Sequence, residues 1–239
     1  IYNRAYSFMT FPVYKITGVL SSVLFPSLSI IQDDMKRVKE IYLRATQMTS
    51  FIIFLFMGLL FLNATEFVLI VLGDQWNELI PLMKIMVFPA ALQSICLLTE
   101  NIFRSQNKYQ LEFKINLLNS LIIILGIICG LQWGIVGVAK AILLSTVLTT
   151  FITLFNVAKV LGDNFFNILK YIFPSLIAFV ILVGFSYVII TSEIFEFSLW
   201  TRLFAQSSIA LILYMGIVYF LDKNIIYAII PLLRKVFNR

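Results

Sequence analysis

Two basic residues stand within the first long apolar stretch of the sequence. Arg4 and Lys15 are eleven positions apart, which is close to three turns of an α-helix. Gly18, Ser22 and Ser29 continue the same helical face, whereas the opposite face is mostly Phe, Val, Ile and Leu. Charged residues in membrane helices usually face a protein interior or a water-filled path. We therefore expect Arg4, Lys15 and Ser22 to line a binding cavity.

Each of the two cations also has an interpretation without a ligand. Arg4 lies near one end of the stretch, so its long side chain can reach the membrane interface. Lys15 lies near the middle by count, and it could instead be the structural partner of an acidic group. Pro12 lies between them and can rotate one relative to the other. The sequence leaves these alternatives open.

Other charges near apolar stretches are weaker candidates. Glu100 and Arg104 have the spacing of an ordinary i, i+4 helical ion pair. Lys84 and Lys140 stand near the ends of their stretches, where snorkelling to the interface is the expected behaviour. Glu66 stands toward the end of its stretch, close to an asparagine.

Residues for covalent chemistry are not apparent. The chain has no His, which excludes His-based metal sites and His general bases. Cys96 and Cys129 lie inside apolar runs, where cysteine behaves as a small hydrophobic residue. P-loop, nucleophile-elbow and metal-ligand motifs do not occur. Asp33 and Asp34 stand in a basic segment and are expected to be solvated charge. The sequence predicts a protein that is not an enzyme, with no catalytic residue, metal or cofactor.

The composition indicates which elements must position the candidate residues. The 239 residues are 61% hydrophobic and 13% charged, and the mean hydropathy is +0.98. Soluble domains are about 45–50% apolar and about 25% charged. A transmembrane helix needs about 20 mostly apolar residues. We therefore predict an all-α, polytopic membrane helix bundle with seven spans, at 5–31, 47–72, 79–103, 113–131, 135–158, 171–190 and 203–221.

Basic residues are concentrated in alternate gaps between these spans. By the positive-inside rule these gaps face the cytoplasm, so the first span runs from outside to inside and the C-terminus is cytoplasmic. Thirteen of the 18 Lys and Arg residues fall on that side: Lys36, Arg37, Lys39, Arg44, Arg104, Lys108, Lys114, Lys159, Lys170, Lys223, Arg234, Lys235 and Arg239. The loops are short, which leaves no room for a soluble catalytic domain. Residues 222–239 are predicted to form a cytoplasmic amphipathic tail on the membrane surface.

Several short strings resemble one transporter superfamily. They are Tyr2-Asn3-Arg4-Ala5-Tyr6, Leu24-Phe25-Pro26, Gln32-Asp33 and Leu72-Gly73-Asp74-Gln75-Trp76 followed by Pro81-Leu82. These strings resemble the Wzx-like polysaccharide flippases of the multidrug/oligosaccharidyl-lipid/polysaccharide exporter superfamily. The resemblance covers residues 1–160 by motif and the remainder by hydropathy only. Because the chain begins at Ile1 with an apparent membrane helix, it is interpreted as a fragment that lacks an N-terminal portion.

The resemblance implies a fold, a substrate and a location. The chain would be the C-terminal half of a two-bundle transporter. Residues 1–160 would supply five helices of the second bundle, and residues 161–221 two peripheral helices. The family's substrate is a lipid-diphosphate-linked oligosaccharide, turned across a bacterial inner membrane by alternating access and coupled to an ion gradient. Arg4 and Lys15 would then supply positive charge for the diphosphate.

Two further function classes remain as alternatives. The first is another transporter of the superfamily, either a drug/cation antiporter or a peptidoglycan-precursor flippase. A drug/cation antiporter should place acidic residues in its cavity, whereas the deepest charge predicted from this sequence is Lys15. The second is a membrane polymerase or ligase of polysaccharide synthesis, which should carry catalytic side chains on a long outer loop. The longest outer loop expected here is Thr191–Arg202.

Overall fold

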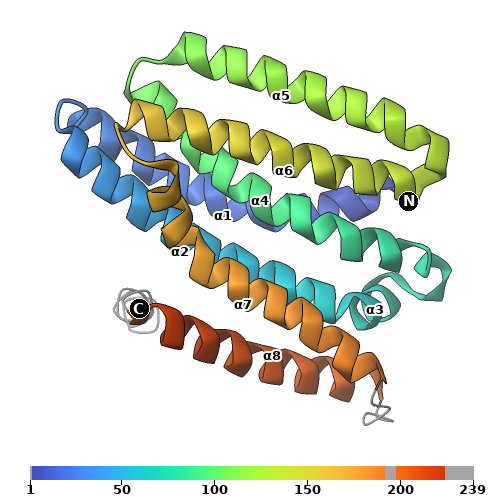
Figure 1. Ribbon diagram of the computed structural model, residues 1–239. Coiled ribbons are helices and arrows are strands. Elements are labelled where there is room, and N and C mark those ends of the chain that lie inside the picture. Colours follow the sequence, from blue (N-terminus) through green and yellow to red (C-terminus); the bar gives the residue numbers. More distant parts are fainter. Residues whose placement is uncertain (1, 192–197, 224–239) are drawn as a thin grey trace.

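The computed structural model describes the backbone of residues 2–191 and 198–223 and the side chains of residues 10–187 and 198–223. Every regular element in these ranges is helical (Figure 1). The seven long helices are α1 (Tyr2–Ile30), α2 (Met35–Leu62), α4 (Leu79–Ser105), α5 (Tyr109–Gly130), α6 (Gly134–Val160), α7 (Phe165–Thr191) and α8 (Leu199–Leu221). The short turns are α3 (Ala64–Phe67), η1 (Val68–Leu72), η2 (Asp74–Trp76) and η3 (Leu131–Trp133).

The long helices have the length and composition of membrane spans. Six helical stretches of the described residues meet both criteria, and one of them, Tyr109–Val160, contains two helices, α5 and α6, joined through η3. Large apolar side chains cover the outer surfaces of these two helices, including Leu125, Leu144 and Phe151. Lipid is the solvent in which such a surface is stable. The chain is a multi-pass membrane helix bundle, and the predicted fold class is confirmed.

The second predicted span differs from the observed helix at both ends. Helix α2 begins at Met35, because the carboxylate of Asp34 accepts a hydrogen bond from the N–H of Arg37 (3.1 Å) and caps the first turn. The segment Gln32–Arg44, expected as a loop, is therefore mostly helical. At the other end, α2 stops at Leu62, and residues up to Leu72 form α3 and the π-helical turn η1. Hydropathy detects only the apolar middle of a helix, so the polar first turns were missed.

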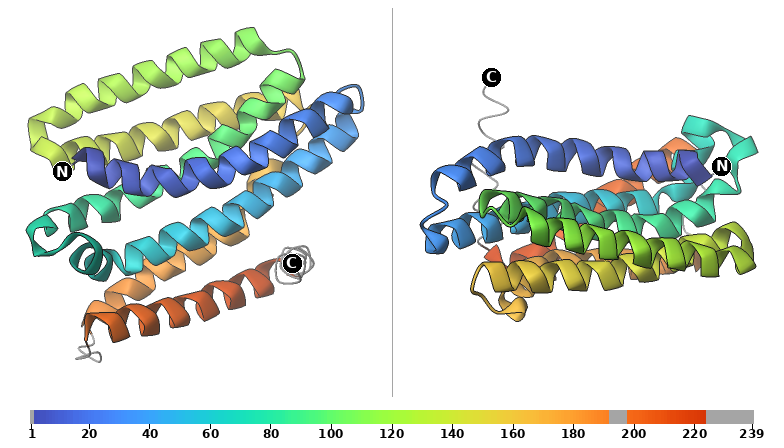
Figure 2. Two further views of the ribbon diagram at one scale, coloured as in Figure 1. Left: turned by 180° about the vertical axis from the view of Figure 1, so that it is seen from behind. Right: turned by 90° about the horizontal axis from the view of Figure 1, so that it is seen from above.

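Helix α4 occupies the centre of the bundle. It packs against α1, α2 and α6, while α5 packs chiefly on α6. Helix α7 packs along α2, and α8 contacts both α7 and α2. As a result, α5 lies at one edge of the bundle and α8 at the other (Figures 1 and 2).

The last two described helices share buried contacts with α2 and α4. Phe179 of α7 stacks near Phe54 and Phe88, with ring centroids 5.8 and 5.2 Å apart. Tyr214 of α8 donates a hydrogen bond to the carbonyl oxygen of Phe51 (3.0 Å). The division into a transport bundle over 1–160 and peripheral helices over 161–221 stays a prediction. The predicted tail lies outside the described residues, apart from Asp222 and Lys223.

The turns after α1, α4 and α6 gather at one end of the bundle (Figure 1). Lys39 of α2 forms an ion pair of 2.8 Å with Asp163 in the turn between α6 and α7. Gln106, after α4, donates to the carbonyl oxygen of Gln32 (3.2 Å) in the turn after α1. Burial disfavours ionised Asp163, but hydrogen bonds from Lys39 and Asn167 and the Lys39 charge outweigh it and hold the pKa of this carboxyl below its usual range.

Two glycines allow α5 and α6 to approach closely. A Cβ on Gly137 would lie 2.5 Å from the carbonyl oxygen of Gly130 and 2.5 Å from Cβ of Trp133. A Cβ on Gly130 would lie 2.8 Å from Cα of Val138. Small residues serve this purpose in membrane helix pairs, where backbone contact replaces the hydrophobic effect as the source of association. The antiparallel α5–α6 hairpin therefore depends on these positions.

We predict that Gly137→Ala destabilises the protein, because the added methyl meets backbone that cannot move aside. The expected loss is about 1–3 kcal/mol, the usual cost of overpacking, measured as the free energy of unfolding in a mixed-micelle SDS titration. Gly216→Ala in α8 is the matched control, since its Cβ would have nothing within 4 Å. Equal stability of the Gly137 variant and the wild type would show that the close approach of α5 and α6 is not needed.

Candidate binding cavity

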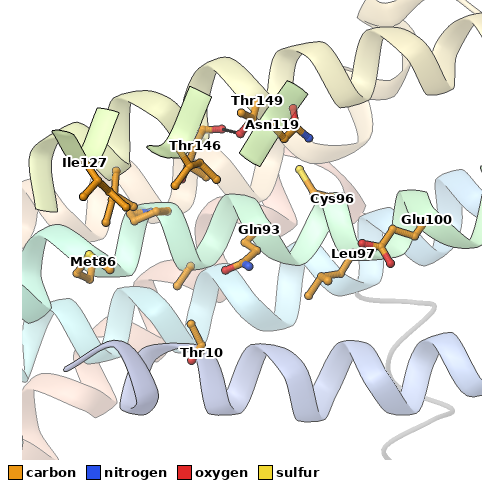
Figure 3. A pocket seen from close by; sticks show the side chains of 14 residues that line it. Thr10, Met86, Gln93, Cys96, Leu97, Glu100, Asn119, Ile127, Thr146 and Thr149 are labelled. Carbon is orange, nitrogen blue, oxygen red and sulfur yellow. Dashed lines mark hydrogen bonds between the residues drawn. The ribbon is translucent and has the colours of Figure 1, made fainter. Parts of the chain in front are cut away.

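A cavity of about 460 Å³ lies between α1, α4, α5 and α6 (Figure 3). Its size falls within the range of about 300–1,000 Å³ that is usual for ligand pockets. Since all four helices are candidate membrane spans, the cavity lies at membrane depth. Its lining consists of Thr10, Met86, Pro89, Ala90, Gln93, Cys96, Leu97, Glu100, Asn119, Ile123, Ile127, Ile142, Thr146 and Thr149.

Helical periodicity brings the lining residues of α4 to one face. Gln93, Cys96 and Glu100 are three and four positions apart, which aligns side chains along a helix. Thr146 and Thr149 have the same relation on α6 and face α4 from the opposite wall (Figure 3). The wall thus alternates hydroxyl and amide groups with aliphatic side chains.

The amide of Asn119 is only partly satisfied. Its Nδ2 donates to Oγ1 of Thr153 (3.2 Å), which holds the side chain between α5 and α6. Its Oδ1 is buried and has no hydrogen-bond partner in the described structure. By contrast, Gln93 donates through Nε2 to the hydroxyl of Tyr14 (3.1 Å), and Thr149 donates to the carbonyl oxygen of Thr146 (3.1 Å). An unpaired buried acceptor is costly, and this oxygen is covered by its neighbours, since it has almost no accessible surface.

An ion-pair cluster lies at the end of the cavity nearest the turn after α4, where Glu100 lines the wall. Arg104 pairs through Nη2 with Glu100 and through Nε with Glu112, both at 2.9 Å. The expected i, i+4 pair of Glu100 and Arg104 is confirmed. The contact with Glu112 was missed, because this residue belongs to α5, beyond the turn. Arg104 thereby joins α4 to α5.

The residues predicted from sequence lie elsewhere on α1. Lys15 and Ser22 are exposed and do not line the cavity. The Nζ atom of Lys15 lies 5.6 Å from the ring centroid of Phe11, and the hydroxyl of Ser22 donates to the carbonyl oxygen of Val19 (2.8 Å). The side chain of Arg4 lies outside the described part. A cavity role for these three residues stays a prediction, and α1 contributes Thr10 to the described lining.

The polar residues of the lining were not found from the sequence. Gln93, Asn119, Thr146 and Thr149 are uncharged, so a search for charge within apolar stretches passes over them. The signal in the sequence that could have found them is the spacing of Gln93, Cys96 and Glu100, which places three polar groups on one face of an apolar helix.

Among the described residues, no group of three or more His, Cys, Asp or Glu is placed to hold a metal ion.

A second cavity, of about 300 Å³, lies on the other side of the contact between α4 and α6. Its walls are apolar side chains of α2, α4, α6 and α7, including Phe54, Phe88 and Phe179, and its one polar lining residue is Thr150. The thiol of Cys96 donates to Oγ1 of Thr150 (3.5 Å) across the seam between the two cavities. Of these two cavities, only the first has several polar residues in its lining.

Comparison with known proteins shows that this chain is similar to proteins of polysaccharide biosynthesis. Residues 1–81 match the family described as "Polysaccharide biosynthesis protein". The chain is 27% identical over 166 residues to the lipopolysaccharide biosynthesis protein WzxC of Escherichia coli, a match covering 69% of this chain and 34% of that protein. The resemblance to the Wzx-like polysaccharide exporters is confirmed.

Two further relatives are similar to this chain. An uncharacterized membrane protein in the cps region of Klebsiella pneumoniae is 27% identical over 164 residues, which cover 68% of this chain and 34% of that protein. The teichuronic acid biosynthesis protein TuaB of Bacillus subtilis is 25% identical over 114 residues, which cover 47% of this chain and 23% of that protein. The chain thus matches about a third of the length of its first two curated relatives. No solved structure matches it significantly.

Proposed function

We propose that this chain is part of a transporter that moves lipid-linked oligosaccharide or polysaccharide across the cytoplasmic membrane by alternating access. The observation that carries the proposal is the cavity between α1, α4, α5 and α6, which places hydroxyl and amide groups at membrane depth. Relatives with names in lipopolysaccharide and teichuronic acid biosynthesis support the glycan as cargo. Transport of this kind breaks no covalent bond, so no catalytic residue is required.

The chemistry of the lining suits the polar part of such a substrate. A saccharide crossing the bilayer loses its hydrogen bonds to water, and each unmade bond in hydrocarbon costs several kcal/mol. Gln93, Asn119 and Thr149 offer replacement donors and acceptors inside the bundle. For transport to proceed, the affinity for the glycan must differ between two states of the protein. The Arg104 cluster, which joins α4 to α5 at one end of the cavity, is suited to differ between such states.

The orientation follows from the charge distribution. The turns after α1, α4 and α6 lie at one end of the bundle. The basic residues in these turns or in the helix ends beside them are Lys36, Arg37, Lys39, Arg104, Lys108, Lys159 and Lys170. By the positive-inside rule, this end faces the cytoplasmic side of a bacterial inner membrane, and the C-terminus lies on the same side. The Arg104 cluster then lies at the cytoplasmic end of the cavity.

The exposed face of α1 is proposed to serve the diphosphate of the substrate. Lys15, Gly18 and Ser22 share this face, and an ammonium at membrane depth is stable only beside an anion, water or a polar protein surface. Lys15 would neutralise a phosphate held beside the cavity rather than within it. Arg4, about three turns nearer the helix N-terminus by spacing, is retained as its proposed companion.

One observation favours the antiporter alternative. Glu100 lines the cavity, and a carboxylate is the group that a drug/cation antiporter requires for binding a cation. However, Arg104 lies 2.9 Å from this carboxylate and neutralises it. The polar lining is otherwise uncharged in the described residues, which suits a saccharide better than a cation. We therefore retain the glycan as the proposed cargo.

We predict that Thr149→Val reduces polysaccharide export by about fivefold, since one hydrogen bond contributes about 1 kcal/mol. Export is measured as surface polysaccharide per transporter in cells that depend on the intact protein. Thr17→Val is the matched control: both threonines are buried and donate to a carbonyl of their own helix, but Thr17 does not line the cavity. Equal export by the Thr149 and Thr17 variants would contradict a role for the cavity.

A second prediction concerns Lys15. Lys15→Ala should abolish export at near-normal abundance in the membrane, whereas Lys15→Arg should retain part of it, because the charge is kept and only the geometry changes. Lys140→Ala, an exposed lysine near the opposite end of the bundle, is the control and should export normally. Normal export by Lys15→Ala would refute the role, and loss of the protein from the membrane would favour the structural interpretation of Lys15.

A further inference from the structure

The second cavity lies where α6 and α7 separate. The two helices meet beside their shared turn, where the ring centroids of Phe151 and Phe165 are 5.8 Å apart, and then diverge (Figure 1). Away from the turn, α6 packs on α4 and α5, whereas α7 packs on α2. Phe151 is half exposed and also lines the cavity, so the cavity is open on the outer surface of the bundle.

The size and lining of this cavity suit a hydrocarbon chain. An apolar cavity of about 150 Å³ stays free of water and accepts a benzene molecule. A cavity of about 300 Å³ therefore has room for a segment of about a dozen carbon atoms. If it were empty, its aromatic and aliphatic walls would lose their dispersion contacts. At membrane depth, the groups at hand to fill it are lipid chains.

The contact between α4 and α6 decides the source of the chain. These two helices pack together between the first and the second cavity, and Cys96 donates to Thr150 across the contact (3.5 Å). A substrate whose glycan lies in the first cavity cannot pass its own lipid through this contact. A chain in the second cavity therefore belongs to a separate lipid molecule.

Two lysines stand at the end of the second cavity nearest the turn between α6 and α7. Lys170 directly follows a lining residue of α7, and Lys159 lies five residues beyond the last lining residue of α6, about 7–8 Å along the helix. Both lysines are exposed. Among the described residues neither pairs with a carboxylate, because Asp163 in the turn between them pairs with Lys39.

We propose that the second cavity is a binding site for an anionic phospholipid of the bilayer, with one acyl chain between α6 and α7 and the phosphate beside Lys159 and Lys170. Basic sites between membrane helices recognise anionic headgroups, and each basic residue near the surface strengthens binding about fivefold. A zwitterionic lipid satisfies the apolar walls but leaves the two positive charges uncompensated. The inference does not depend on the transported cargo. Only the leaflet that supplies the lipid, the cytoplasmic one, rests on the proposed orientation.

Photochemical labelling of the intact protein tests the proposal. The protein is placed in nanodiscs of neutral lipid that contain a small fraction of phosphatidylglycerol or phosphatidylcholine, each with a diazirine in the middle of one acyl chain. Adducts are mapped by mass spectrometry. Adducts on the lining residues Val147 and Leu176 report the cavity, and adducts on Leu125, an exposed residue of α5, report bulk lipid.

Relative to Leu125, phosphatidylglycerol is expected to label the cavity at least fivefold more than phosphatidylcholine. Equal labelling of the cavity by the two lipids would overturn the proposal. No cavity adduct with either lipid would show that another part of the intact protein covers the site, and would overturn it as well.

Lysine variants test the headgroup contact. Lys159→Gln and Lys170→Gln should each lower cavity labelling by phosphatidylglycerol about fivefold and leave labelling by phosphatidylcholine unchanged. Lys114→Gln removes an exposed lysine of α5 near the same end of the bundle and should change neither. Undiminished labelling by phosphatidylglycerol in the double variant of Lys159 and Lys170 would contradict the assigned contact.

A filled cavity tests the place of the chain. Val147→Trp adds bulk to the lining and should remove labelling of Leu176 by both lipids, whereas Leu148→Trp changes an exposed neighbour outside the lining and should preserve it. Unchanged labelling in Val147→Trp would overturn the proposal. Stronger cavity labelling by a photoactivatable polyprenyl phosphate than by phosphatidylglycerol would assign the cavity to the lipid of the substrate, and would also overturn it.

Discussion

Helix α4 is tied to each of its neighbours by a polar contact within the span. Gln93 and Asn101 reach Tyr14 and Ser21 on α1. Thr99 pairs with the hydroxyl of Tyr42 on α2, and Cys96 donates to Thr150 on α6. Arg104 completes the set with Glu112 on α5. In lipid, where apolar burial drives little helix association, such contacts fix which helices lie side by side.

The cavity follows from how these contacts are distributed. The polar contacts of α4 with α1, α2 and α6 lie along the length of these helices, and α4 packs closely against all three. In the described structure, the side-chain hydrogen bond that joins α5 to α4 is that of Arg104, next to the turn. Helix α5 packs chiefly on α6, through the glycine contacts at Gly130 and Gly137. The space left between α4 and α5 holds the polar side chains that packing does not cover. Among the described residues, Arg104 is the one side chain that forms an ion pair between α4 and α5.

Sequence reasoning succeeded where a single physical signal dominates. Apolar length placed all seven helices, and charge alternation placed the basic turns at one end. Hydropathy missed the start of α2 at Met35, where a capped polar turn precedes the apolar residues, and its end at Asn63, where the apolar run continues but the long α-helix does not.

The cavity could not be predicted from the sequence, for a different reason. Which face of α4 meets α5 depends on contacts such as Arg104 with Glu112 and Asn119 with Thr153, which join residues of different helices. Lys15, the more conspicuous residue, lies on the exposed face instead.

Flipping by the purified protein is the most direct test of the central claim. The intact protein is reconstituted into vesicles that contain a fluorescent lipid-linked oligosaccharide in one leaflet, and its arrival in the other leaflet is followed with a membrane-impermeant quencher. The account predicts transfer well above that of protein-free vesicles, loss of this transfer in Asn119→Leu, and no comparable movement of a fluorescent phospholipid. Transfer no faster than in protein-free vesicles, or equal movement of the phospholipid, would contradict it.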